Sequence, residues 1–251
     1  MMIDTHCHLD IDDYDDVEKV ISNMNGNIMV ASGCNMKTNM RVLELTEKYS
    51  NIFGTIGIHP DEISSNIEED LEFIEMCLNN PKIVGVGEIG LDYYWNKDNK
   101  NEQKSAFIKQ IRLAKKYNKP IVIHSREAAE DTYNILRDNL GNTKAILHCY
   151  SSSLEMAKKF KQLGIKFGIG GVLTFKNSSK LQDIVKELDL NDLVLETDSP
   201  YLTPEPYRGK RNEPFNVIYV AKKIAEIKNI SVEEVLEITS QNAVAQFDLK
   251  V

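Results

Sequence analysis

Leu193-Val194-Leu195-Glu196-Thr197-Asp198 is a short run that begins with aliphatic residues and ends at an acid, and it decides the predicted fold. It is the last of eight runs of about four to seven residues, each bounded by turn formers and typical of a buried strand. The other seven, from the nearest to the most distant, span residues 166–172, 145–148, 120–124, 83–88, 52–58, 28–33 and 3–8.

Segments with helical periodicity fill the gaps between these runs. Residues 103–117, for example, carry an apolar stripe with lysines on the opposite face. After the eighth run, residues 214–227 and 232–247 predict two more helices, the second opened by a Ser231-Val232-Glu233-Glu234 capping box. Eight strands that are each followed by a helix predict an α/β fold, a single-domain (β/α)8 TIM-type barrel over residues 1–251 with one extra C-terminal helix. The alternative is an open doubly wound sheet, which usually has fewer strands.

The composition is that of a folded globular protein. With 42% hydrophobic and 27% charged residues, the 251-residue chain can bury a large core. No apolar stretch approaches the ~20 residues that cross a bilayer. The N-terminus lacks the basic and then apolar plan of a signal peptide. We therefore expect a cytoplasmic protein that does not contact a membrane.

Net charge and cysteine content exclude further classes of protein. A net charge of −8 argues against a protein that coats nucleic acid, because that task needs a surplus of Lys and Arg on one face. A small active site for a polyanion is still compatible with it. The four cysteines are too few and too far apart for a disulfide scaffold or a Cys-x-x-Cys motif. They are predicted to be reduced and mostly buried: Cys7, Cys34, Cys77 and Cys149.

All five histidines fall at the carboxyl ends of predicted strands, where barrels of this kind place their active sites. His6 and His8 are two residues apart on one strand, so their side chains point to the same side and suit chelation of one ion. His124 and His148 end neighbouring strands and could share a second ion. A lone strand histidine is more often a hydrogen-bonded core residue, but the set of five, with His59, favours a metal centre.

Carboxylates at other strand ends complete the predicted metal centre, because ions that promote hydrolysis usually have acidic ligands. Glu88 ends the fourth strand, between the two histidine pairs, and could bridge two metals. Asp198 ends the eighth strand beside the first, so it could bind metal and accept a proton. The alternative for both acids is that they cap the following turns. Glu196 also faces inward and is expected to orient a histidine.

The run Gly85-Val86-Gly87-Glu88-Ile89-Gly90 matches the glycine pattern of dinucleotide-binding folds. That pattern must open a helix whose N-terminus holds the pyrophosphate. Residues 91–98 are instead rich in aromatic residues and Asn, so we predict a long loop there and no dinucleotide site. The glycines are expected to relieve crowding around the buried metal centre.

Taken together, the strand-end motifs resemble the TatD family of metal-dependent deoxyribonucleases, which belongs to the amidohydrolase-like barrels. The resemblance covers essentially the whole chain and keeps the motifs in order. Many amidohydrolase relatives carry a modified lysine where this chain has Glu88, which favours the nuclease-type branch. The motifs are Asp4-Thr5-His6-Cys7-His8-Leu9, Gly57-Ile58-His59-Pro60, Gly87-Glu88-Ile89-Gly90-Leu91-Asp92-Tyr93, His124-Ser125-Arg126, His148-Cys149-Tyr150, Glu196-Thr197-Asp198-Ser199-Pro200-Tyr201-Leu202 and Arg211-Asn212-Glu213-Pro214.

The resemblance implies two divalent metal ions and a catalytic pair, Asp198 and Glu88. It assigns His6, His8, Glu88 and Asp198 to one ion and Glu88, His124 and His148 to the other. Imidazole-rich ligand sets favour Zn, Mn, Ni or Co, whereas the family is usually described as Mg-dependent, so the identity of the metal stays open.

The function that the resemblance implies is hydrolysis of phosphodiester bonds from DNA ends, in the manner of a 3′ to 5′ exonuclease, by metal-activated water. Its substrate would be single-stranded DNA or DNA ends, with no obligate protein partner. His59, Arg126 and Arg211 are candidate phosphate donors, and the aromatic residues at 93–95 and 201 could stack on bases. Two alternatives stay open: the same centre hydrolysing a small ester, lactone or acylated nucleotide, and a non-catalytic, metal-stabilised binding protein.

Overall fold

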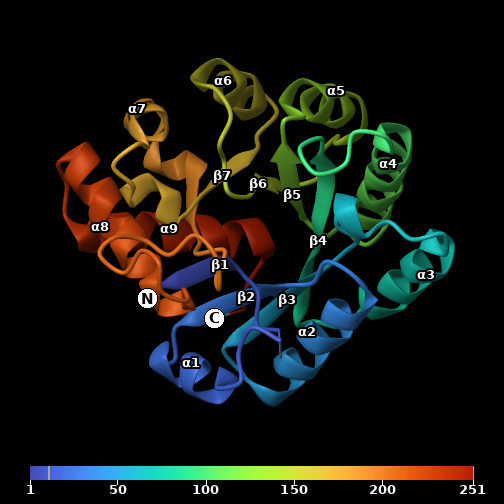
Figure 1. The fold of residues 1–251 in the computed structure, drawn as a ribbon, viewed down its shortest axis with the longest axis horizontal. Helices are drawn as coiled ribbons and strands as arrows, with labels where there is room; N and C mark the ends of the chain where they lie inside the picture. Colours follow the sequence, from blue (N-terminus) through green and yellow to red (C-terminus); the bar gives the residue numbers. More distant parts are fainter. Residues whose placement is uncertain (11, 251) are drawn as a thin grey trace.

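A single sheet of eight parallel strands forms the centre of the molecule, and each strand hydrogen-bonds to the next one in the chain (Figure 1). The computed structural model describes residues 1–10 and 12–250. The strands are β1 (Ile3–Cys7), β2 (Ile28–Ser32), β3 (Ile52–Ile56), β4 (Ile83–Asp92), β5 (Ile121–Arg126), β6 (Ala145–Leu147), β7 (Lys166–Ile169) and β8 (Leu193–Leu195).

The sheet closes on itself just beyond the ends of its first and last strands. Cys7 and Ser199 form a parallel bridge, and His8 N–H donates to Ser199 O at 2.7 Å. Asp198 N–H donates to His6 O at 2.9 Å. The predicted barrel is therefore confirmed, and the open doubly wound sheet is wrong, because an open sheet leaves its edge strands apart.

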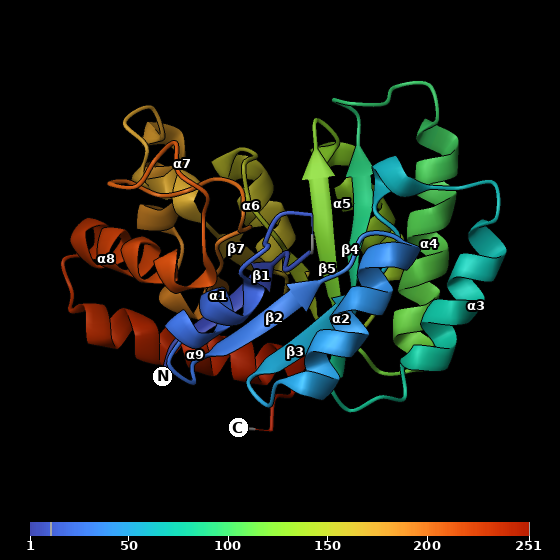
Figure 2. The same cartoon turned by 60° about the horizontal axis from the view of Figure 1, so that its bottom comes forward.

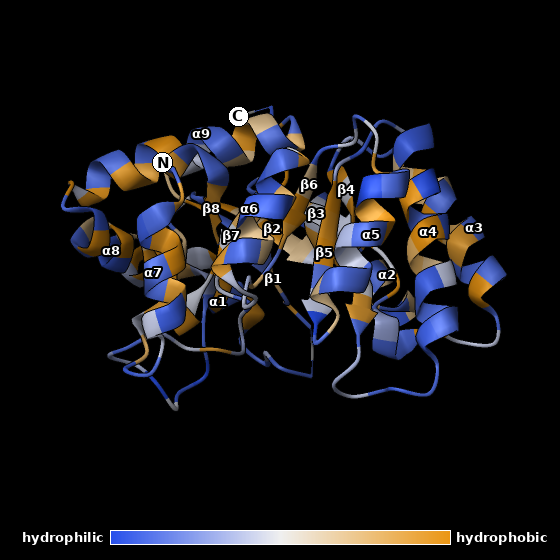
Figure 3. Cartoon of the chain, turned by 90° about the horizontal axis from the view of Figure 1, so that it is seen from above, coloured by the Kyte–Doolittle hydropathy of each residue, from blue (hydrophilic) through white to orange (hydrophobic). Residues whose placement is uncertain are grey.

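Helices surround the barrel and alternate with its strands, as predicted. Figure 3 shows the apolar strands at the centre and helices with hydrophilic outer faces. None of the helices in the described residues is both long and apolar enough to cross a bilayer. They are α1 (Val17–Asn23), α2 (Met36–Lys48), α3 (Ile67–Cys77), α4 (Lys100–Lys116), α5 (Ala129–Asn139), α6 (Leu154–Gln162), α7 (Ser179–Glu187), α8 (Val217–Lys228) and α9 (Val232–Phe247).

The extra helix α9 closes the amino-terminal end of the barrel (Figure 2). It begins and ends where the sequence predicts, and the Ser231 side chain caps it by accepting a hydrogen bond from Glu234 N–H at 3.1 Å. Its last turn packs into an apolar cluster with residues from the barrel strands. The cluster comprises Ala243, Phe247, Leu249, Ile3, Ile28, Val30, Phe53, Val84, Val122, Ile146 and Val194.

The fourth strand is longer than predicted. β4 continues past Glu88 to Asp92, where it pairs with Arg126 of β5, so the expected loop begins only at Tyr93. Its glycines permit the close approach of β5: Gly90 has φ +143°, and a Cβ there would lie 2.0 Å from His124 O. The glycines thus relieve crowding against the neighbouring strand, whereas the crowding expected from the sequence was around the metal centre.

Candidate metal centre

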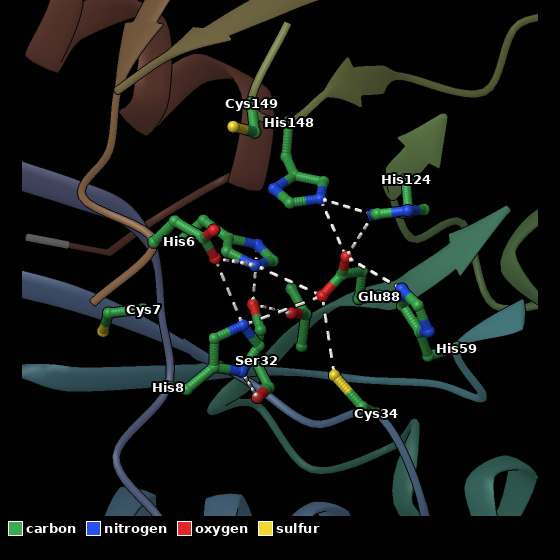
Figure 4. A network of polar contacts seen from close by, with 12 residues as sticks. His6, Cys7, His8, Ser32, Cys34, His59, Glu88, His124, His148 and Cys149 are labelled. Atoms are coloured by element: carbon green, nitrogen blue, oxygen red, sulfur yellow. Dashed lines mark hydrogen bonds and ion pairs between the residues drawn. The ribbon is translucent and has the colours of Figure 1, made fainter. Parts of the chain in front are cut away.

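A cavity of about 480 Å³ opens at the carboxyl ends of the strands. Figure 4 shows side chains from separate strands converging on Glu88 in this region. Four of the five histidines line the cavity, and His6 lies beneath them with no exposed surface. The structure therefore brings together residues from strands spread over most of the chain.

The Glu88 carboxylate is the hub of this arrangement. Its Oε1 lies 2.9 Å from His124 Nδ1 and 2.8 Å from His148 Nε2. Its Oε2 lies 3.4 Å from His6 Nε2 and 3.7 Å from His8 Nε2. Each oxygen thus serves one of the two histidine pairs, the arrangement that a bridging carboxylate requires.

Asp198 faces the first pair of histidines. Its Oδ1 lies 3.4 Å from His8 Nε2 and 3.7 Å from His6 Nε2. β8 already ends at Leu195, so Asp198 stands on the loop beyond the strand, with φ +54°. A non-glycine residue in this left-handed region is uncommon and often marks a functional site. Here it is secured by the bond from its N–H to His6 O.

Partners outside the cluster orient two of the imidazole rings. His8 Nδ1 lies 3.1 Å from Ser32 O, which can only accept, so Nδ1 carries the proton and Nε2 is free to face the acids. His124 Nε2 lies 2.8 Å from Asp92 Oδ2, which leaves Nδ1 to face Glu88. Such outer hydrogen bonds are the ones that orient histidine ligands of metals.

His6 and His148 carry buried ring nitrogens with no hydrogen-bond partner in the described residues, Nε2 of His6 and Nδ1 of His148. Burial, and then the neighbouring His148, lowers the pKa of His6 to about 4, so its ring is neutral. A buried polar atom without a partner is destabilising. Nε2 of His6 points at Glu88 and Asp198, and a divalent cation at that point would satisfy all three groups. The donor set therefore fits a metal.

Carboxylates and imidazoles in this network stabilise each other's charged forms, as the pKa shifts of His124 and Glu88 show. Burial opposes protonation of His124, but hydrogen bonds to Asp92 and Glu88 outweigh it and raise its pKa to about 9. Burial alone would raise the pKa of Glu88, yet the surrounding histidines, His148 foremost, hold it well below its usual range. The cluster is thus built around an ionised carboxylate, which is the form that binds a cation.

His59 is oriented differently from the other histidines. Its Nδ1 accepts a hydrogen bond from Asp61 N–H at 3.2 Å, so the ring proton resides on Nε2. That nitrogen lies 3.5 Å from Glu88 Oε1. Although His59 stands near enough to Glu88 and His124 to form a metal-sized group, it presents N–H rather than a lone pair to the cavity.

Of the two predicted arginines, the structure brings only Arg126 to the cavity. Its guanidinium lies 4.0 Å from the centre of the Tyr94 ring and 5.5 Å from that of Trp95. Arg211 is held elsewhere: its Nη2 is 2.7 Å from Asp16 Oδ1 and 3.7 Å from Glu213 Oε1. It does not line the cavity, because the acidic segment after β1 captures it.

Glu196 lies behind His148 but beyond hydrogen-bond distance of its ring, so the expected role of Glu196 in orienting this histidine stays a prediction. Its Oε1 accepts a hydrogen bond from Cys149 N–H and lies 3.8 Å from His148 Nδ1. Burial raises the pKa of Glu196 to about 7. A Cβ at Gly168 would lie 2.1 Å from Glu196 Oε2, so only glycine leaves room for this carboxylate.

Three residues of the site are not predicted from the sequence. Asp92 and Ser32 orient histidines, and the Cys34 sulfur lies 3.5 Å from Glu88 Oε2. Burial and Glu88 raise the pKa of the Cys34 thiol to about 12. An acid four residues after Glu88, within a stretch otherwise rich in aliphatic residues, was an available signal for Asp92. Ser32 and Cys34 stand at the end of the second predicted strand, where a serine or a cysteine alone does not indicate a metal site.

A (β/α)8 barrel with converging imidazoles and carboxylates at the carboxyl ends of its strands defines the class of barrel hydrolases that depend on metal. Comparison with known proteins agrees. The family model described as "TatD related DNase" matches residues 3–248. The "Uncharacterized metal-dependent hydrolase YabD" of Bacillus subtilis is 42% identical over 248 residues, 97% of each chain.

Further relatives cover equally long parts of the chain. The uncharacterized metal-dependent hydrolase YcfH of Escherichia coli K12 is 32% identical over 99% of this chain and 96% of its own. The crystal structure of YjjV, a TatD homologue from Escherichia coli K12, superposes with a TM-score of 0.89 at 29% identity, covering 99% of this chain and 98% of that one. The chain therefore belongs to the TatD family of metal-dependent hydrolases.

Proposed function

We propose that two divalent ions bind on either side of Glu88 and that the enzyme hydrolyses phosphodiester bonds at the ends of DNA strands. The observation that carries the proposal is the division of the Glu88 carboxylate between two histidine pairs, one oxygen to each. The first ion would be held by His6, His8, Glu88 and Asp198, the second by Glu88, His124 and His148.

Bound divalent ions would supply an activated water and stabilise the charge on a phosphate oxygen. The residues of this chain would accept the proton and bind the phosphate. Burial alone would raise the pKa of the Asp198 carboxyl, but the surrounding histidines, His8 foremost, hold it below its usual value, so the carboxyl is ionised and able to accept a proton. His59 Nε2–H and the Arg126 guanidinium face the same cavity as donors to phosphate oxygens.

The rim of the cavity suits nucleotides. Trp95 is 67% exposed and Tyr94 46% exposed, although both are large aromatic groups, and Trp95 lines the cavity. Exposed aromatic rings beside a phosphate-binding group are the usual means of holding single-stranded nucleic acid, because a base stacks on the ring while the backbone contacts the cation. The Arg126 guanidinium packs against both rings, so its positive charge lies next to the surface on which a base would stack.

The acidity of the cavity makes the binding of an anion depend on metal. Six carboxylates line it, against the one arginine: Asp10, Asp61, Glu62, Glu88, Asp92 and Asp198. Without divalent ions these groups would repel a phosphodiester. The ions at Glu88 would offset much of this charge at the point where the phosphate must lie.

A strand end reaches such a centre more readily than the middle of a duplex. Glu88 is 4% exposed and lies below the rim, so a scissile bond must enter the cavity. A terminus can enter directly, whereas a duplex must first be bent or melted, which costs several kcal/mol or more.

The test is to incubate metal-loaded protein with end-labelled single-stranded DNA, an RNA of equal sequence, and a panel of carboxyl esters and lactones. We expect a DNA ladder that shortens by single nucleotides from the 3′ end, and no ladder with Glu88→Gln. Cleavage of intact circular DNA would contradict entry from an end. Activity on esters alone, with DNA untouched across several metals, would transfer the assignment to small-ester hydrolysis.

A further inference from the structure

Cys34 is a thiol in the cavity that the proposed reaction does not use. It lies between β2 and α2 and lines the cavity together with His8 and Glu88. Its Sγ is 3.5 Å from Glu88 Oε2, the oxygen that also faces His6. Figure 4 shows the sulfur pointing at this carboxylate from the side opposite the other cysteines drawn.

The backbone holds Cys34 in this position. Its N–H donates to Thr38 Oγ1 at 2.8 Å, and its C=O accepts from His59 N–H at 2.8 Å. The next residue, Asn35, caps α2 with a reciprocal capping box. The place of the sulfur therefore follows from the start of α2, and the thiol is presented to the cavity by rigid structure rather than by a loose loop.

Three candidate donor atoms lie at ligand-like distances from Glu88 Oε2. His6 Nε2, His8 Nε2 and Cys34 Sγ lie 3.4, 3.7 and 3.5 Å from this oxygen. Neighbouring ligand atoms bound to one ion at about 2.0–2.3 Å are about 3–4 Å apart. In addition, His6 Nε2 is fully buried, has no hydrogen-bond partner among the described residues, and faces the same oxygen. The sulfur thus joins a group whose donor atoms fit a cation.

We propose that Cys34 is a fifth ligand of the first ion, as a thiolate beside His6, His8, Glu88 and Asp198, and that it makes this half of the centre prefer a thiophilic ion such as Zn²⁺ or Co²⁺ over Mg²⁺. The inference rests on the proposed metal centre. Binding replaces the S–H bond by a sulfur–metal bond and releases the proton to solvent, with no change of oxidation state. Soft sulfur ligands select zinc-like ions, whereas Mg²⁺ requires oxygen.

The experiment is titration of the metal-free protein with Co²⁺, followed by absorption spectroscopy. Visible d–d bands report loading of the ion whatever its ligands, and a near-ultraviolet thiolate-to-cobalt charge-transfer band reports a sulfur ligand. Wild type should show both. Cys34→Ser should keep the visible bands and lose the charge-transfer band. Cys77→Ser, at the end of α3, is the matched control and should keep both.

The titration also measures affinity. Cys34→Ser should bind Co²⁺ at the first site at least about tenfold more weakly, the loss that follows even removal of a group that only supports a ligand, while Mg²⁺ affinity should change little. Visible bands without a charge-transfer band in wild type, or a charge-transfer band retained by Cys34→Ser, would overturn the proposal for Cys34 alone. Absence of the visible bands in wild type would overturn the metal centre, and with it the proposed function.

Discussion

At the scale of single residues, the histidines of this site differ in role because their ring nitrogens have different partners. At His8 a carbonyl oxygen, and at His124 a carboxylate, accepts a hydrogen bond from one ring nitrogen, so the other nitrogen faces Glu88. At His59 a backbone N–H donates to one ring nitrogen, so the other nitrogen carries the proton and faces the cavity as a donor. One residue type thus offers both lone pairs that suit a metal ion and a hydrogen-bond donor, and the surrounding hydrogen bonds decide which of the two each ring presents.

Metal content should be lost one site at a time. His8→Ala should empty the first site and His148→Ala the second, whereas Glu88→Gln should weaken both, because each Glu88 oxygen faces one pair. Metal analysis of the purified variants measures this. His59→Ala is the control and should keep both ions, since its N–H faces the cavity. Full occupancy in all the variants would end the two-site model.

Asp198→Asn should lose far more activity than metal. Asp198 Oδ1 lies 3.4 Å from His8 Nε2, and an amide at this position would still offer an oxygen to an ion, but it cannot accept a proton at neutral pH. The comparison is turnover on single-stranded DNA against metal content for the same preparation. A fall of less than about tenfold, ~1.4 kcal/mol of barrier, would mean that Asp198 is not the proton acceptor.

At the scale of elements, the continuation of β4 to Asp92 shapes the site. It places Asp92 beside β5, where it orients His124. It also determines where the following loop leaves the sheet. Asp92 Oδ1 accepts hydrogen bonds from the N–H groups of Tyr94 and Trp95, so the aromatic pair starts from a fixed turn at the cavity rim.

Trp95→Ala should weaken binding of single-stranded DNA without changing metal content. Loss of one stacked base is worth about 1–3 kcal/mol, which corresponds to a rise of about 5- to 150-fold in Kd. Fluorescence anisotropy with a labelled oligonucleotide measures it on the metal-loaded protein. Tyr207→Ala is the matched control, because Tyr207 is also exposed but does not line the cavity. Equal effects of the two changes would argue against stacking at Trp95.

The cap of α9 should contribute measurably to stability, because Ser231 satisfies the Glu234 N–H at the start of this helix. Ser231→Ala should lower the free energy of unfolding by about 1 kcal/mol, and Ser231→Gly by only a few tenths. Urea denaturation of both variants measures the difference. If Ser231→Ala leaves the free energy of unfolding unchanged, the side-chain bond contributes nothing.

At the scale of the whole molecule, the apolar cluster that stabilises the barrel and the candidate metal centre lie at opposite ends of it. The amino-terminal end is filled by an apolar cluster that includes Phe247 of α9. The carboxyl-terminal end gathers buried acids and imidazoles around Glu88, and one side-chain atom each of His6, His148 and Glu196 has no hydrogen-bond partner in the part of the chain that the structure describes. The carboxyl-terminal end of the barrel is therefore less stable without a bound cation, and metal binding should be linked to folding.

Metal should raise the melting temperature. At a free Zn²⁺ concentration of about 100 times Kd, the folded state gains about 2.7 kcal/mol, or about 5–10 °C for a chain of this size. Differential scanning calorimetry with and without chelator measures the shift. Glu88→Gln should show a much smaller one, because it weakens both sites. An unchanged melting temperature in wild type at saturating metal would contradict the linkage.

The sequence by itself determined the architecture. Apolar runs, their spacing and the cap at Ser231 are local signals, and local signals predict strands and helices because both depend on periodicity along the chain. Eight strand–helix units in a chain of this length then predict a closed barrel. Parallel strands bring all their carboxyl ends to one rim, so the histidines and acids that end those strands had to meet there.

Only the tertiary structure decided the finer contacts. The register of β4 against β5 sets Asp92 beside His124, the start of α2 aims Cys34 at Glu88, and an acidic segment holds Arg211 away from the cavity. Each depends on residues that are distant in the chain. Neither the spacing nor the type of a residue encodes such a contact, because strand register and loop path are set by packing of the whole barrel.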